Sequence, residues 1–175
     1  MWKRILSRVI LDHPRISVIE DIIELPNGKE TEYIRIGKRN DGAMVIAQNN
    51  EGKILVLKEY SYPPNKVLYE FPGGAIEDNE SPELAAQREL GEEGGVKGFL
   101  EQIGWFYVDN RRNDTKMHVY IATNLSTVDA KNDEEESFEL FWMKTDEIEV
   151  LISNGDFPTY SGLASWALYK NYLKK

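Results

Sequence analysis

The 175-residue sequence contains no cysteine, which excludes a disulfide framework, thiolate metal ligands and a cysteine nucleophile. Histidine is nearly as rare, with His13 and His118 as the only two. Zinc sites in proteins usually draw on several thiolates or imidazoles, so we do not expect one here. We interpret both histidines as structural residues.

Positive charge is also scarce, because 21 lysines and arginines face 30 aspartates and glutamates, giving a net charge of −9. This balance argues against a nucleic-acid or anionic membrane partner, since no basic stripe is present to neutralise phosphates. A small anionic substrate would need a metal ion or local arginines. Long hydrophobic runs are missing too, because charges interrupt the apolar residues of Met1 to Arg8. We therefore predict neither a signal peptide nor a membrane span, and we expect a cytoplasmic protein.

The most informative stretch runs from Gly74 to Val96, and its middle is predicted to be helical. Ser81 can cap the helix, Pro82 suits its first position, and Gly94-Gly95 offers a left-handed stop. We therefore predict a helix from about Pro82 to Glu93.

Three carboxylates share one side of this helix, because Glu89, Glu92 and Glu93 are three and four residues apart. Glu92 and Glu93 also lie in the last turn, where the helix dipole is unfavourable for negative charge. A divalent cation held by oxygen ligands, magnesium or manganese, would compensate for both effects. The alternative is a solvated acidic helix in which Arg88 pairs with Glu92.

The ordered glycines and arginine around these acids resemble the Nudix box. The match comprises seven fixed identities and two apolar positions, namely Gly74, Glu80, Arg88, Glu89, Glu92, Glu93 and Gly95 with Leu90 and Val96. The N-terminal Pro-Asn-Gly turn, Glu70-Phe71-Pro72-Gly73-Gly74 and the C-terminal stretch are similar to the branch of ADP-ribose pyrophosphatases and nucleoside diphosphate sugar hydrolases.

The resemblance implies a role for each box residue. Glu89 and Glu93 would be the principal metal ligands, Glu92 a further one, and the carbonyl of Gly73 a backbone ligand. Arg88 would orient the glutamates, while Gly74, Glu80 and Gly95 would be structural. For Glu80 a second interpretation stays open, because an acid just before a helix is favoured by the dipole alone.

In that branch the general base is a glutamate on the loop before the last sheet strand. Here the loop ends in Glu134-Glu135-Glu136, and Glu134 or Glu136 is favoured by its position. The other interpretation of such a run is a solvated acidic loop, since a base must reach the attacking water.

Four further residues are candidate substrate contacts. Glu70 belongs to the resembling segment, and Lys58 stands near Ser61, where the branch often carries an arginine. Arg111 and Arg112 could grip a distal phosphate or sugar with their guanidinium forks, or simply be exposed. The branch's proline is missing from Tyr107 to Arg112, which favours other nucleoside diphosphate sugars over ADP-ribose.

The chain is predicted to fold as an α/β sandwich with a mixed sheet, preceded by an antiparallel hairpin. The hairpin strands are Arg15 to Leu25 and Glu30 to Ile36, around Asn27-Gly28. Further predicted elements are strands at Ala43 to Ala47, Lys53 to Leu57, Leu100 to Val108, Met117 to Thr123 and Glu139 to Met143, a loop at Lys58 to Asn65, and helices at Asp146 to Ser153, capped by Thr145, and Tyr160 to Lys174. We divide the chain into residues 1–40, which by resemblance form a homodimer, and a Nudix hydrolase domain over 41–175.

The resemblance implies metal-dependent hydrolysis of a nucleoside diphosphate sugar to a nucleoside monophosphate and a sugar phosphate. The competing hypothesis is a module that binds a nucleotide sugar without turning it over. Such regulators usually lose one or more box acids, and this sequence retains them all. RNA decapping is disfavoured by the acidic charge.

Overall fold

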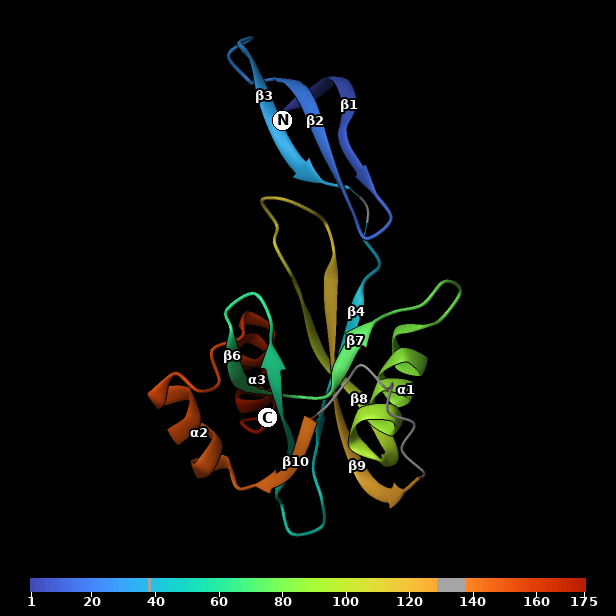
Figure 1. The fold of residues 1–175 in the computed structure, drawn as a ribbon, viewed down its shortest axis with the longest axis vertical. Coiled ribbons are helices and arrows are strands. Elements are labelled where there is room, and N and C mark those ends of the chain that lie inside the picture. The colour runs from blue at the N-terminus through green and yellow to red at the C-terminus, as the bar shows by residue number, and fades with distance from the viewer. Residues whose placement is uncertain (38, 129–137) are drawn as a thin grey trace. The chain divides into compact units, whose positions relative to one another are not determined.

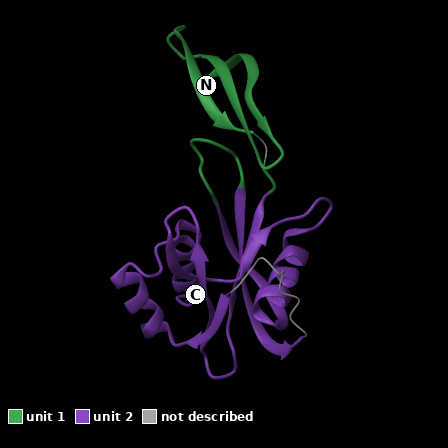
Figure 2. Cartoon of the chain, viewed as in Figure 1, with its two compact units in different colours: residues 1–40, 107–115 green, residues 41–106, 116–175 purple. Residues whose placement is uncertain are grey.

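The computed structural model describes residues 1–37, 39–128 and 138–175, which form two compact units (Figure 2). Unit 1 comprises Met1–Asn40 and Tyr107–Thr115, and unit 2 comprises Asp41–Phe106 and Lys116–Lys175. Within the described residues, no helix has the length and apolar character needed to span a membrane.

Unit 1 is built on an antiparallel three-stranded sheet in the order β1-β2-β3 (Figure 1). Its strands are β1 (Lys3–His13), β2 (Ile16–Glu24) and β3 (Glu30–Ile36). The predicted hairpin is confirmed by β2 and β3, whose turn closes through Gly28 at φ 79°. The first strand was missed. Two register shifts, between Arg4 and Leu6 and between Val9 and Leu11, break the alternation of side chains that identifies a strand in sequence.

Unit 2 contains two sheets. A mixed four-stranded sheet has the order β7-β4-β9-β8, in which β4 runs parallel to β9 and antiparallel to β7. An antiparallel three-stranded sheet has the order β10-β5-β6. The strands are β4 (Gly42–Ala47), β5 (Ile54–Ser61), β6 (Lys66–Glu70), β7 (Gly73–Ala75), β8 (Val96–Tyr107), β9 (Lys116–Thr127) and β10 (Phe138–Met143).

Strand β4 lies between two cores, because every one of its residues is buried and alternate side chains face opposite layers. Ala43 and Val45 pack with Leu90 of α1 (Pro82–Gly94) in one core. Met44 and Ile46 pack in the other, with α2 (Thr145–Asn154) and α3 (Tyr160–Tyr172). The helices therefore cover both faces of the mixed sheet, and the predicted α/β sandwich is confirmed (Figure 1).

Two local predictions are wrong. Strand β5 continues to Ser61, into residues predicted to be loop, because its end pairs with β6 in the register Ser61↔Lys66. Helix α2 is capped by Lys144 rather than Thr145. The Lys144 amide donates to the Glu147 carboxylate at 2.7 Å, which satisfies the exposed helix end without a hydroxyl cap.

Candidate active site

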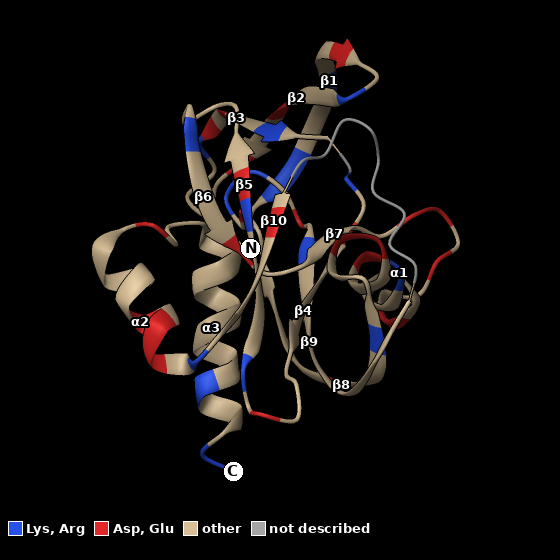
Figure 3. Cartoon of the chain, turned by 60° about the horizontal axis from the view of Figure 1, so that its bottom comes forward, with Lys and Arg blue, Asp and Glu red and all other residues tan. Residues whose placement is uncertain are grey.

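Helix α1 begins and ends where its sequence predicts. The Leu84 amide donates to Ser81 Oγ at 3.2 Å, and Pro82 occupies the first turn. Gly95 adopts φ 62°, and its amide donates to carbonyls of the last turn. Acidic residues gather on this helix and on the loop leading into it (Figure 3). The two caps fix the register in which those acids are presented.

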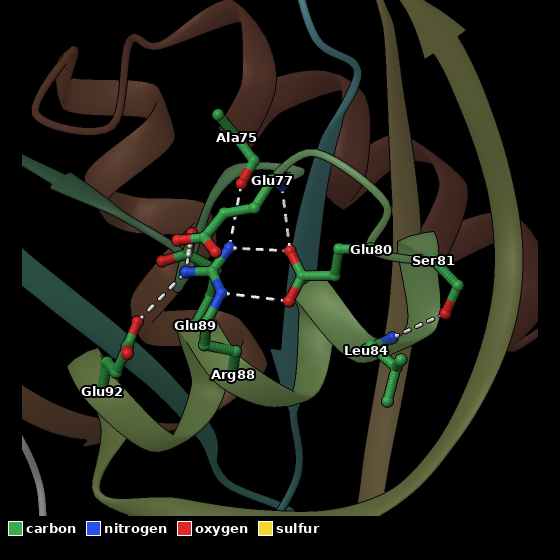
Figure 4. Close-up of polar contacts among 8 residues, drawn as sticks. All are labelled: Ala75, Glu77, Glu80, Ser81, Leu84, Arg88, Glu89 and Glu92. Atoms are coloured by element: carbon green, nitrogen blue, oxygen red, sulfur yellow. Dashed lines mark hydrogen bonds and ion pairs between the residues drawn. The ribbon is translucent and has the colours of Figure 1, made fainter.

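Arg88 contacts three of the acids with one guanidinium (Figure 4). Its Nε and Nη2 each donate to Glu80 at 3.1 Å, in a fork that uses both carboxylate oxygens. Its Nη1 donates to Glu89 at 2.8 Å and to Glu92 at 3.1 Å. The Glu92 pair suggested by the sequence therefore exists, as one part of a larger network.

The network is partly buried, which strengthens its electrostatics. The Arg88 and Glu80 side chains are 24% and 14% exposed. The hydrogen bond from Arg88 is the main cause of the lowered pKa of Glu80, and the same bond is the main cause of the raised pKa of Arg88. Both groups are therefore charged over the whole physiological pH range.

Glu80 also orders the loop before the helix, because its carboxylate accepts from the Glu77 amide at 3.0 Å. Arg88 Nη2 donates to the Ala75 carbonyl at 2.9 Å, which ties the helix to β7. Sequence reasoning missed both contacts, since a backbone carbonyl or amide leaves no mark on residue identity.

The two glycines of β7 bring its backbone against the acids. The Gly73 amide donates to Glu93 Oε2 at 2.8 Å. A Cβ on Gly74 would lie 2.3 Å from Glu89 Oε1, and one on Gly73 would lie 2.4 Å from the Ala43 carbonyl oxygen. Only glycine leaves space for these contacts.

The carboxylate oxygens of Glu89, Glu92 and Glu93 match a hard divalent cation in kind, and they lie beside the two glycines of β7. Within the described part of the chain, no three acidic or histidine side chains converge as a metal-binding group. Glu89 and Glu92 hydrogen-bond to Arg88, and Glu93 to the Gly73 amide. The match therefore rests on donor chemistry and on the space that the glycines leave.

Lys58 and Glu70 do not share a face of their sheet. Glu70 lies opposite Leu57 in the ladder, whereas Lys58 lies opposite Tyr69 and points the other way. Lys58 Nζ pairs with Glu139 at 3.1 Å. Burial is the main cause of the raised pKa of Glu70, and the nearby charge of Glu59 adds to it.

The remaining candidates lie elsewhere in the chain. Arg111 and Arg112 belong to unit 1. Glu134 and Glu136 lie outside the described residues, so the geometry of the site does not include the suggested base.

Comparison with known proteins gives matches over nearly the whole chain. The sequence profile described as the NUDIX domain matches residues 38–163. The ADP-ribose pyrophosphatase of Bacillus subtilis (strain 168) is 31% identical over 176 residues, covering 99% of this chain and 94% of the relative. The methanol dehydrogenase activator of Bacillus methanolicus is 35% identical over 150 residues, covering 83% and 80%. A crystal structure of an ADP compounds hydrolase has the same fold, with a TM-score of 0.91 at 21% identity over 99% of this chain and 94% of the other.

Replacing Arg88 with lysine is expected to lower the free energy of unfolding by about 2 kcal/mol, because an ammonium group cannot reproduce the fork that binds Glu80 while also reaching Glu89. Urea denaturation followed by circular dichroism measures the change. Arg8→Lys is the matched control: Arg8 pairs with one acid, Glu20, at an exposed position, and its replacement should leave stability nearly unchanged. Equal effects of the two substitutions would contradict the network.

The raised pKa of Glu70 predicts a pH-dependent stability difference. The folded state binds this proton more tightly than the unfolded state, so stability falls as pH rises from the ordinary pKa of 4.5 through the raised value. Glu70→Gln cannot ionise and does not suffer this loss. The melting temperature of Glu70→Gln relative to that of wild type should therefore rise between pH 4 and pH 7. Glu32→Gln, at an exposed position of β3, should follow wild type. A difference between Glu70→Gln and wild type that stays constant over this range would refute the prediction.

Proposed function

The chain belongs to the Nudix family of hydrolases, and from that premise we propose that it hydrolyses the pyrophosphate bond of a nucleoside diphosphate sugar, ADP-ribose included. The products would be a nucleoside monophosphate and a sugar phosphate. The observation that carries this proposal is the network of Arg88 with Glu80, Glu89 and Glu92 beside the Glu93 bound by Gly73. The name of the Bacillus subtilis relative supports the substrate class.

The carboxylates of Glu89, Glu92 and Glu93 and the carbonyl of Gly73 would hold Mg²⁺, or Mn²⁺ in its place. When bound, such an ion neutralises pyrophosphate charge and lowers the pKa of a bound water. The chain's own contribution is orientation. Arg88 positions Glu89 and Glu92, and the Gly73 amide positions Glu93, so three like charges stay on one side of the helix.

The remaining roles follow from the chemistry of the reaction. Glu134 or Glu136 would accept the proton of the attacking water. Glu70, with its raised pKa, would contact the substrate from β6, and Lys58 would have to exchange its pair with Glu139 for a substrate phosphate. Arg111 and Arg112 would contribute guanidinium groups to phosphate or sugar.

The first experiment incubates the full-length protein and magnesium with ADP-ribose, ADP-glucose, GDP-mannose and UDP-glucose, and counts the phosphomonoesters released. We expect turnover of at least one, and a loss of about a hundredfold or more in Glu93→Gln, because a metal ligand contributes several kcal/mol to the transition state. Glu83→Gln, at an exposed position of the same helix, is the matched control. Absence of turnover with tight binding of one compound would favour the nucleotide-sugar-binding module.

The same assay tests the base. Glu134→Gln, Glu135→Gln and Glu136→Gln are compared individually. Either Glu134→Gln or Glu136→Gln should lose more than tenfold in turnover. If all three retain turnover within tenfold, the base lies elsewhere in the chain.

We propose that residues 1–40 carry a homodimer interface. Strand β1 is an edge strand that pairs only with β2 among the described residues, and all of its residues are exposed. Its apolar side chains include Leu6 at 58% and Val9 at 59% exposure. An exposed edge with this many apolar side chains favours pairing with another chain.

Sedimentation velocity should show a dimer for wild type and a monomer for the double variant Leu6→Lys with Val9→Lys, because two buried ammonium groups would oppose association. Thr31→Lys, which adds the same charge at an exposed position of β3, should remain dimeric. A wild-type monomer at micromolar concentration would rule the interface out.

A further inference from the structure

Unit 1 contains a cavity of about 310 Å³ whose wall is strongly basic. Four arginines line it: Arg4 from β1, Arg35 from β3, and Arg111 and Arg112 from the turn of residues 108–115. One acid, Asp114, shares the lining. The whole chain has a net charge of −9, so the positive charge of this cavity is opposite in sign to that of the chain as a whole.

The turn that supplies two of these arginines is internally braced. The Asp109 carbonyl accepts from the amides of Arg112 and Asn113 at 2.9 and 2.8 Å, and its side chain accepts from the Arg111 amide at 3.2 Å. Val108 donates to the Thr115 carbonyl at 2.9 Å, which closes the base of the turn. These bonds hold the turn in one conformation.

Strand β3 then fixes the turn against the sheet of unit 1. The Ile36 amide donates to the Arg112 carbonyl at 2.8 Å, and the Tyr33 hydroxyl donates to the Arg111 carbonyl. Arg112 Nη1 returns a bond to the Ile34 carbonyl at 2.9 Å. The cavity wall is therefore formed by the fold of unit 1 itself and does not need a ligand to assemble it.

The four arginines differ in what they already bind. Arg35 pairs with the buried Asp21 at 2.6 Å, and Arg112 lies over the Tyr33 ring at 5.9 Å. Among the described residues, the guanidinium groups of Arg4 and Arg111 make neither a hydrogen bond nor an ion pair, although the charge of Arg4 helps to lower the pKa of Asp21. Two guanidinium groups on one cavity wall therefore have N–H donors that no described side chain accepts, and an anion could accept them.

We propose that this cavity binds a phosphate group, with Arg4 and Arg111 as its principal contacts and Arg112 and Arg35 as the fixed part of its wall. Phosphate oxygens match guanidinium forks in geometry as well as in charge. All of the lining residues belong to unit 1, whereas helix α1 belongs to unit 2, so the proposal does not depend on the proposed hydrolysis. The phosphate can belong to the nucleotide substrate or to a separate ligand.

Isothermal titration of the full-length protein with inorganic phosphate and with AMP tests the cavity. EDTA is present throughout, so that no metal ion contributes to binding. We expect wild type to bind AMP, and Arg4→Gln and Arg111→Gln each to weaken binding about tenfold or more, because each removes a charged hydrogen-bond donor. Arg8→Gln is the matched control, since Arg8 carries the same charge on the same strand as Arg4 but does not line the cavity.

The proposal would be overturned if wild type bound neither inorganic phosphate nor AMP. It would also be overturned if Arg4→Gln and Arg111→Gln bound AMP as wild type does, or if Arg8→Gln weakened AMP binding as much as they do. Kinetics of Arg111→Gln with a hydrolysed nucleotide sugar then separates the two sources of phosphate. A raised KM with kcat retained assigns the cavity to the substrate, and an unchanged KM assigns it to a separate ligand. Phosphate binding without turnover of any nucleotide sugar would refute the proposed function and leave the cavity standing.

Discussion

Repulsion among the carboxylates of α1 is the constraint on which the site depends. Glu89, Glu92 and Glu93 share one side of a helix whose last turn is already unfavourable for negative charge. Arg88 relieves this repulsion by bonding to two of them and to Glu80, which anchors the guanidinium from the other side. The three acids can therefore share one side of the helix without destabilising it.

Strand β4 connects this electrostatic arrangement to the rest of unit 2. Its alternate side chains enter two different cores, so the helix with the acids and the pair α2 and α3 pack against five consecutive residues, 43–47. Strand β7 pairs with β4 through Gly73, Gly74 and Ala75. Gly73 and Ala75 hydrogen-bond to Glu93 and Arg88, and Gly74 leaves the space that the Glu89 carboxylate occupies. The acids are thus positioned next to a strand whose residues are all buried.

Unit 1 shows a different use of charge. Its sheet leaves apolar side chains of β1 exposed, while its turn of residues 108–115 collects arginines next to Tyr33. In unit 2 an arginine is surrounded by acids, and in unit 1 arginines surround a cavity. The two arrangements would recognise opposite partners, a cation in the first and an anion in the second.

The sequence by itself determined the elements whose signals are local. Ser81, Pro82 and Gly95 fixed the limits of α1, spacing along the helix placed its acids on one side, and Asn27-Gly28 fixed a hairpin. Only the tertiary structure showed the fork between Arg88 and Glu80 and the opposite orientations of Lys58 and Glu70. It also showed strand β1 and the hydrogen bonds that hold Arg111 and Arg112 against β3. Each of these depends on backbone atoms or strand registers that residue identity does not specify, because a one-residue shift in pairing reverses every side chain of a strand.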